Sequence, residues 1–122
     1  MTTITEDYVS FETAKLLKEK GFGQNCATYY LDGQVWRHYH GEVIPKGKQI
    51  YAAPTQAMAM KWLREVHNIV IVVTSSMFWG KYNVSIYKKG NDYPYGFDGG
   101  DLVPSYEQAC ESSIKYCLEN LI

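Results

Sequence analysis

An apolar run in the middle of the chain, Ile69-Val70-Ile71-Val72-Val73, most strongly limits the folds that this sequence can adopt. Five residues are too few to span a bilayer, and β-branched side chains dominate them, so the run predicts a strand over residues 69–74. Because no position in the run is polar, we expect this strand to be central and covered, at least in part, on both faces. An amphipathic segment, Thr55–His67, ends directly before it, with Asn68 as the helix stop.

Three segments have the periodicity of amphipathic helices. The first is Ser10–Lys20, with Ser10 as N-cap, Gly21 at a left-handed C-terminal position, and Phe22 placed to pack back on the helix. The second is the segment before the apolar run, and the third is Ser105–Asn120, which begins with a capping box. The apolar arc of the second helix holds Met58, Ala59, Trp62, Leu63 and Val66. The apolar arc of the third helix holds Tyr106, Ala109, Cys110, Ile114, Cys117 and Leu121.

Two regions predict pairs of antiparallel strands. Cys26–Tyr39 predicts a hairpin around Asp32-Gly33, a dipeptide typical of type I′ turns because both of its residues must adopt positive φ. That turn places Tyr29 opposite Trp36. A short edge strand is expected around Gln49–Ala52.

The second pair joins the apolar run to Lys81–Lys88 through the short link 75–80. In Lys81–Lys88 the side chains alternate, so that Tyr82, Val84 and Ile86 share one face and the other face is exposed to water.

The predicted order of elements is α-ββ-α-ββ-α in a single domain over residues 1–122. Hydrophobic residues make up 46% of the chain and charged residues 20%, which is typical of a globular domain. These elements can bury their apolar faces in an α+β fold, in which three amphipathic helices pack on an antiparallel sheet of about four strands as a two-layer sandwich.

Several segments resemble a protein family. They are Ala59–Ile69, Ser105–Glu111 with Lys115–Ile122, and the opening segments Asp7–Glu12 and Leu16–Phe22. They are similar to small proteins of gut Bacteroidales and of the phages and prophages found in them, for which no catalytic or binding residues are established. The resemblance implies an accessory protein carried by a mobile element, and it implies no activity.

Charge and cysteine content exclude several function classes. The net charge of −1 gives no bulk electrostatic reason to expect binding to nucleic acid or to an anionic membrane. Three cysteines do not form a disulfide scaffold. The first residues have neither a basic nor an apolar leader segment, so we expect a cytoplasmic protein with free thiols that does not associate with membranes.

Aromatic residues give the best functional indication, because the chain has 11 Tyr, 3 Trp and 4 Phe. Tyr and Trp concentrate at protein interfaces, where they contribute large contact areas. We therefore predict a non-enzymatic protein-interaction module that binds a host or phage protein or self-associates as a homodimer. The predicted contact residues are Phe78 and Trp79 at a hairpin tip, Tyr93, Tyr95 and Phe97 in a long loop, and Trp36 in the first hairpin. The alternative is that both loops fold back and close the core.

Two other function classes stay open. A small nucleic-acid-binding domain would use the polar strand face for base stacking beside cations, with residues Lys81, Asn83, Ser85, Tyr87 and Lys89. An enzyme would need a titratable pair, such as His38 and His40 with an acid from the loop around Asp98. The two histidines are also weak candidates for metal ligands, since no third ligand is marked. No cofactor is expected.

Overall fold

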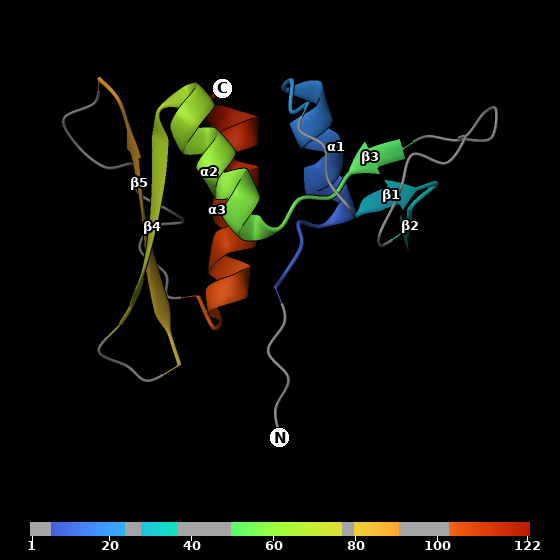
Figure 1. Ribbon diagram of the computed structural model, residues 1–122. Helices are drawn as coiled ribbons and strands as arrows, with labels where there is room; N and C mark the ends of the chain where they lie inside the picture. Colours follow the sequence, from blue (N-terminus) through green and yellow to red (C-terminus); the bar gives the residue numbers. More distant parts are fainter. Residues whose placement is uncertain (1–5, 24–27, 37–49, 77–79, 91–102) are drawn as a thin grey trace.

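The computed structural model describes residues 6–23, 28–36, 50–76, 80–90 and 103–122 (Figure 1). The chain is a mixed α+β protein with antiparallel strands, and the order of its helices and strand pairs follows the prediction. The helices are α1 (Phe11–Glu19), α2 (Gln56–His67) and α3 (Tyr106–Asn120). The strands are β1 (Tyr29–Leu31), β2 (Gln34–Trp36), β3 (Ile50–Ala52), β4 (Ile69–Ser75) and β5 (Tyr82–Lys88).

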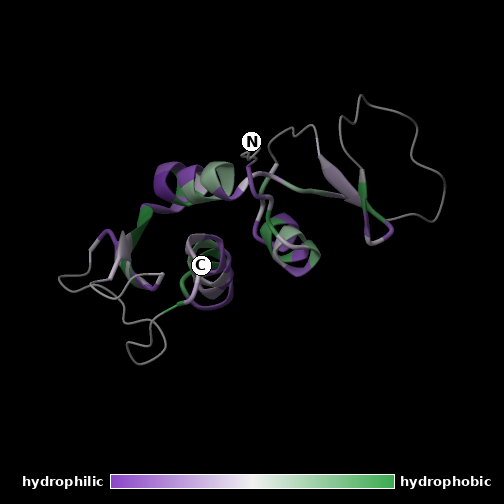
Figure 2. Ribbon diagram, turned by 90° about the horizontal axis from the view of Figure 1, so that it is seen from below, coloured by the Kyte–Doolittle hydropathy of each residue, from purple (hydrophilic) through white to green (hydrophobic). Residues whose placement is uncertain are grey.

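The strands are divided between two sheets. One sheet has the order β2-β1-β3, and the other consists of β4 and β5. Both are antiparallel. The two sheets lie at opposite sides of the molecule, with the helices between them (Figures 1 and 2). The sheets therefore do not merge into the single four-stranded layer of the sequence-based arrangement, because helices occupy the space that would join them.

Helix α3 occupies the centre of the fold. It contacts α1, α2, β4 and β5. Its inward face is buried from Ala109 to Leu118, and the polar Ser113 on this face is satisfied, because its hydroxyl donates to the carbonyl of Ala109. The buried residues of α3 are Ala109, Cys110, Ser113, Ile114, Cys117 and Leu118. A helix enclosed in this way fixes the positions of its neighbours.

The two ends of α1 are formed by the residues that the sequence predicted, Ser10 and Gly21. The Ser10 hydroxyl accepts the N–H of Thr13 at 3.2 Å, and Gly21 has a φ of +94°. The N–H of Phe22 then donates to the carbonyl of Leu17 at 2.9 Å, which closes the helix. The ring of Phe22 is buried and lies 5.4 Å from that of Trp62, so the residue after the turn anchors α1 in the core.

The first hairpin has the predicted turn. Asp32 and Gly33 have φ values of 54° and 84°, as a type I′ turn requires. Tyr29 pairs with Trp36 as expected, and the outer ends of the predicted hairpin, residues 26–27 and 37–39, lie outside the described residues. Strand β3 adds the expected edge strand on the other side of β1.

The passage from α2 into β4 takes place at Asn68, which has a φ of 57° and donates its N–H to the carbonyl of Leu63. The expectation that β4 is central and covered on both faces is wrong. Among the described residues β4 pairs only with β5, and α2 and α3 pack against one face of this sheet. Ile69 and Ile71 are buried there, whereas Val70 and Val72 are exposed.

The predicted apolar arcs of α2 and α3 need correction at their margins. Met58, Val66 and Tyr106 are exposed, because the helices bury a narrower apolar stripe in the core than their sequence periodicity predicts. Gln56 is buried although it is polar, and its side-chain amide donates to the carbonyl of Glu107 in α3. Leu118 is also buried.

The Asn68 turn can be tested by substitution. Asn68→Val should lower the free energy of unfolding by about 1–2 kcal/mol, because a β-branched residue is strained in the left-handed conformation. Asn68→Gly should leave it within about 0.5 kcal/mol of the wild type. Urea titrations followed by far-ultraviolet circular dichroism measure both. Equal losses in the two variants would mean that the Asn68 side chain, rather than its backbone angle, is what stabilises the turn.

Candidate functional site

Most of the aromatic residues predicted to bind a partner lie outside the described residues. They are Phe78 and Trp79 in the link between β4 and β5, and the loop residues Tyr93, Tyr95 and Phe97. The candidate enzyme or metal residues His38 and His40 also lie outside the described residues. Trp36 is placed in β2 opposite Tyr29, and only its backbone is described. The roles assigned to these residues stay predictions.

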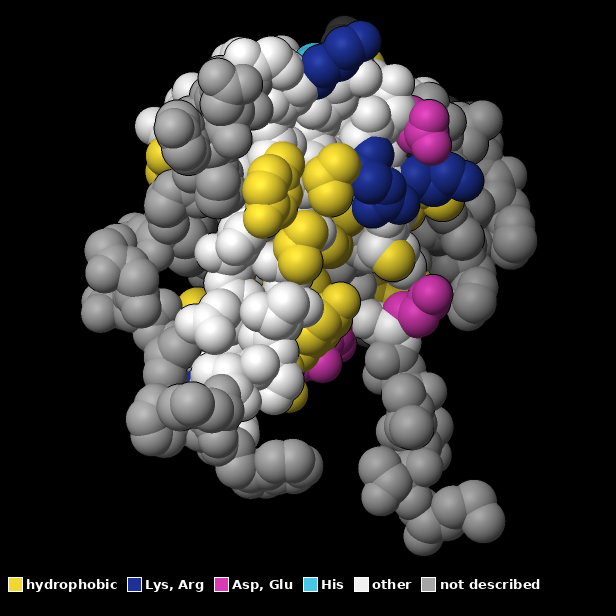
Figure 3. All heavy atoms as spheres, turned by 90° about the vertical axis from the view of Figure 1, so that its left-hand side faces the viewer, with side chains coloured by type: hydrophobic (Ala, Val, Ile, Leu, Met, Phe, Trp, Pro, Cys, Tyr) yellow, Lys and Arg dark blue, Asp and Glu magenta, His cyan; other side chains and the backbone are white. Residues whose placement is uncertain are grey.

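The outer face of β4–β5 is the first candidate surface, and we refer to it as the outer sheet face. Its cross-strand pairs are Val70 with Tyr87, Val72 with Ser85, and Thr74 with Asn83. Val70, Val72 and Tyr87 are 40%, 37% and 47% exposed. The polar side chains predicted on one face of residues 81–89 thus lie beside valines of β4. These valines make the centre of the outer sheet face hydrophobic. Figure 3 views the molecule from this side and shows hydrophobic side chains gathered in the middle, with basic side chains beside them.

The charges of the outer sheet face lie at its ends. Lys81 precedes β5 and Lys89 follows it, and both are exposed. In an extended strand they stand about 26 Å apart. The described residues between them on this face are neutral, so no continuous cationic track runs along it. Tyr87 beside Lys89 could stack on a base, but the uncharged centre favours a protein partner over nucleic acid.

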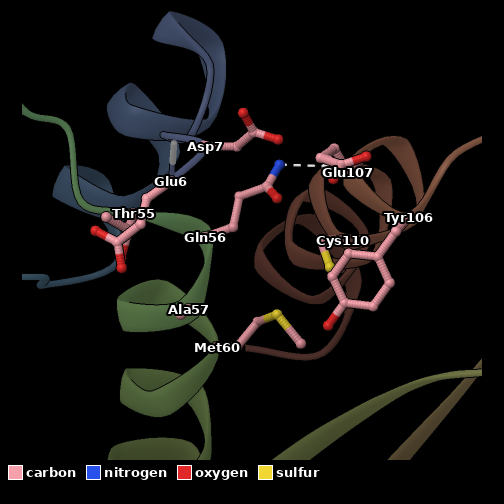
Figure 4. A pocket seen from close by; sticks show the side chains of 9 residues that line it. All are labelled: Glu6, Asp7, Thr55, Gln56, Ala57, Met60, Tyr106, Glu107 and Cys110. Carbon is pink, nitrogen blue, oxygen red and sulfur yellow. Dashed lines mark hydrogen bonds between the residues drawn. The ribbon is translucent and has the colours of Figure 1, made fainter. Parts of the chain in front are cut away.

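A cleft between the first turns of α2 and α3 is the second candidate site. It encloses about 180 Å³. The acidic residues Glu6, Asp7 and Glu107 line it, together with Met60 and Tyr106 (Figure 4). We refer to it as the acidic cleft.

Backbone hydrogen bonds hold the walls of the acidic cleft together. The N–H of Gln56 donates to the carbonyl of Asp7 at 2.9 Å, which fixes the segment before α1 against the start of α2. The side-chain amide of Gln56 donates from Nε2 to the carbonyl of Glu107 at 3.0 Å, which fixes α2 against α3. On the far wall the ring of Tyr106 lies edge-on to that of Tyr82, at 6.0 Å.

The electrostatics of the acidic cleft oppose thiol chemistry. Burial raises the pKa of the Cys110 thiol, the neighbouring Tyr106 hydroxyl opposes this, and the nearby carboxylates of Glu107, Asp7 and Glu111 raise the pKa further. The pKa of Tyr106 is raised by its proximity to Cys110, by burial and by Glu107. The described lining holds no histidine or lysine that could act as a base. The thiol is therefore protonated at neutral pH, and the cleft does not activate a nucleophile.

The other described residues add no metal or catalytic cluster. Within residues 6–23, 28–36, 50–76, 80–90 and 103–122, no three His, Cys, Asp or Glu side chains are grouped so as to hold a metal ion. Glu111 serves the fold, because its Oε1 accepts both the N–H of Ser10 and the hydroxyl of Thr13 at 2.8 Å, at the start of α1.

Sequence reasoning missed both the apolar half of the outer sheet face and the acidic cleft. Val70 and Val72 were assigned to the interior because a two-sided cover was assumed for β4. The cleft joins Glu6 and Asp7 to residues about fifty and one hundred positions further along the chain, and no spacing in the sequence links them.

Comparison with known proteins gives no relative for this chain, since it matches no protein-family model, no curated protein and no solved structure. The family resemblance noted in the sequence therefore stays a prediction. In the described part of the chain, none of the helices combines the length and apolarity that crossing a bilayer requires.

The two described cysteines should be inert in the folded protein. Cys110 and Cys117 are buried, and burial raises the pKa of Cys117 to about 12. We expect iodoacetamide at pH 8 to alkylate neither thiol in the native state and both in urea. Peptide mapping by mass spectrometry distinguishes them from Cys26. Rapid native alkylation of Cys110 would show that the acidic cleft activates its thiol.

His67 should make the fold sensitive to acid. Its Nε2 is buried without a partner in the described structure, and its ring lies 4.6 Å from that of Trp62. Burial, and secondly the charge of Lys88, lower its pKa below 6.5. The unfolded state therefore binds the proton more readily, and stability present above pH 6.5 is lost as the pH falls through the lower, folded-state pKa.

Replacement of His67 tests this contribution. In urea titrations between pH 7.5 and 5, His67→Gln should lose less stability on acidification than the wild type does. If the two proteins have the same pH dependence, His67 titrates normally and its burial has no energetic effect.

Proposed function

We propose that this chain is a non-enzymatic protein-interaction module that self-associates through the outer sheet face. In line with its family resemblance, we place it among accessory proteins of phages or other mobile elements, acting in the cytoplasm. The aromatic loops predicted from the sequence would extend the same interface, because the link with Phe78 and Trp79 connects β4 to β5.

The exposure of Val70, Val72 and Tyr87 on a single sheet face supports the proposal. Removing apolar surface from water contributes about 25 cal/mol per Å², so a cluster of three such side chains is a source of binding free energy when another surface covers it. A two-stranded sheet is also marginal in isolation. Packing a second sheet on its open face would complete a sandwich with this face as its centre.

A second copy of the chain suits this face better than a strongly charged partner does. The centre of the face is uncharged, and the whole chain has a net charge of −1, so two copies repel each other only weakly. In a twofold arrangement the apolar centres meet, and the lysines at residues 81 and 89 stay at the rim, where water solvates them.

The proposal can be tested by measuring the mass of the protein in solution. Sedimentation velocity of the wild type over a hundredfold concentration range should show a reversible monomer–dimer equilibrium. Val70→Asp combined with Val72→Asp should shift it to monomer, because the interface would bury unpaired carboxylates. Both side chains are exposed in the monomer, so the variant should keep its fold, as circular dichroism would show.

Val35 provides a matched control. It is 48% exposed on β2, in the other sheet, so Val35→Asp makes the same chemical change in a strand away from the proposed interface. The control should dimerise like the wild type. A wild type that stays monomeric throughout, or a dimer equally sensitive to both changes, would overturn self-association through this face.

A further inference from the structure

We propose that the free edge of β4 binds an extended segment of a partner protein as an added β-strand, and that this segment carries an acidic residue on the side of α2. This site differs from the outer sheet face, because it uses backbone groups in the plane of the sheet rather than side chains on its surface. Strand addition at this edge therefore does not depend on self-association.

The hydrogen bonds at the two ends of the β4–β5 ladder fix the orientation of its backbone. At one end the N–H of Ser76 donates to the carbonyl of Lys81 at 2.9 Å, and at the other the N–H of Lys89 donates to the carbonyl of Asn68 at 3.0 Å. The register between them is continuous over all seven residues of β4. Because successive residues direct their backbone groups to alternate sides of a strand, the even-numbered residues of β4 face β5.

The odd-numbered residues of β4 direct their backbone groups to the other side, which is the free edge. Ile71, Val73 and Ser75 are in this set. No other described strand or isolated bridge pairs with this edge. It therefore presents a row of N–H and C=O groups with the spacing of a strand, which is the pattern that the backbone of another strand satisfies.

The other edge of the same sheet is protected, unlike the edge of β4. Tyr82 of β5 exchanges two backbone hydrogen bonds with Val103, each at 2.9 Å, so residue 103 extends the ladder there. Lys81 and Lys89 flank β5 on either side. Charged residues, prolines and covering segments are the usual protection of an edge strand, and the sequence of β4 contains no charged residue, proline or glycine.

The outer sheet face favours β-branched side chains in the added strand. The outward side chains of that strand would lie next to Val70 and Val72, which are 40% and 37% exposed. Cross-strand pairs of β-branched residues stabilise a sheet through their contact. A strand added here would thus cover part of both valines while its backbone pairs with β4.

Helix α2 supplies the charge that the partner should complement. It packs against the inner side of β4 (Figures 1 and 2). Its exposed residues Lys61 and Arg64 are three positions apart, so they are neighbours on one helix face, and the exposed Glu65 offsets only one of their charges. Figure 3 shows basic side chains directly beside the hydrophobic ones of the outer sheet face. An acidic side chain of the added strand that points inward would complement this positive charge.

A second copy of the chain suits this edge less well than a partner strand does. Two β4 strands paired across a twofold axis would also bring together the two α2 helices, because α2 packs against β4. Lys61 and Arg64 of one copy would then approach the same cations of the other. Juxtaposed like charges disfavour such a pairing.

Hydrogen exchange of the full-length, isotope-labelled chain tests whether the edge is open. At a concentration where sedimentation velocity shows monomer, the amides of Ile71 and Val73 should exchange about tenfold or more faster than those of Val70 and Val72, because only the latter are bonded to β5. Equal protection of the two pairs would show that the edge is already covered, and it would overturn the proposal. Protection of Ile71 and Val73 that rises with protein concentration would assign the edge to a second copy instead.

A defined peptide tests strand addition itself. The probe is acetyl-Glu-Thr-Val-Thr-Val-Thr-Glu-amide, in which β-branched residues form the centre and an acid at each end serves either strand direction. Its titration should slow the exchange of the Ile71 and Val73 amides about tenfold or more. The same peptide methylated on its internal backbone nitrogens keeps the side chains and the charge but has lost its central donors, so it should not bind. Equal binding of the two peptides would contradict backbone pairing.

A matched pair of proline variants locates the binding. Val73 and Val84 lie directly opposite each other, both are partly buried, and their N–H groups point to opposite edges of the sheet. Val73→Pro removes a donor at the β4 edge and should weaken the peptide about tenfold or more. Val84→Pro makes the same change at the β5 edge and should bind like the wild type. Circular dichroism checks the fold of both, and equal weakening would place the effect in the sheet as a whole rather than at the β4 edge.

The charge of α2 is tested separately. Arg64→Gln should weaken the peptide about two- to fivefold, as the loss of an exposed ion pair does. Lys15→Gln removes the same charge from an exposed position of α1 and should have no effect. Equal effects would mean that the peptide responds to net charge alone. Sedimentation velocity on the same samples reads out self-association independently, so a failure of strand addition and a failure of dimer formation are distinguishable.

Discussion

The burial of α3 is the interaction on which the rest of this structure depends. Its inward stripe contacts α1, α2 and both strands of the β4–β5 sheet, so each of these elements loses its main apolar partner if α3 moves. Polar links fix the orientation of this central helix. Glu111 binds the start of α1, Gln56 of α2 reaches the carbonyl of Glu107, and Lys88 of β5 donates to the carbonyl of Leu121 at 2.6 Å. The apolar stripe supplies the stabilising burial, and these hydrogen bonds set direction and register.

This arrangement leaves half of one sheet without a cover. Two helices pack on the inner face of β4–β5, and the described chain has no further element on the outer face. The alternation of strand side chains then places Val70, Val72 and Tyr87 in contact with water. The outer sheet face is thus a direct consequence of a sheet with one covered side. The acidic cleft arises from the same packing, because α2 and α3 begin side by side and the segment before α1 passes across them.

Local signals in the sequence predicted the elements well. The Asp32-Gly33 turn, the Ser10 cap, the glycine after α1 and the left-handed Asn68 all depend on residues close together in the chain, and the structure confirms each of them. The alternating strand at Tyr82–Lys88 is confirmed for the same reason. The errors arose where distant elements decide the outcome. A run of apolar residues does not reveal whether helices cover one or both sides of its strand, and a helical wheel does not reveal how wide a stripe its neighbours will bury.

The sequence by itself determined the α+β composition, the order of helices and strand pairs, and the caps and turns that bound them, because these features follow from interactions within a few residues. Only the tertiary structure decided that the strands form two sheets, that Val70 and Val72 face water, and that Glu6, Asp7, Gln56 and Glu107 meet around one cleft. Those outcomes depend on which surfaces exclude water from one another when the chain closes around α3. That choice is made between segments far apart in the chain, where residue spacing gives no information.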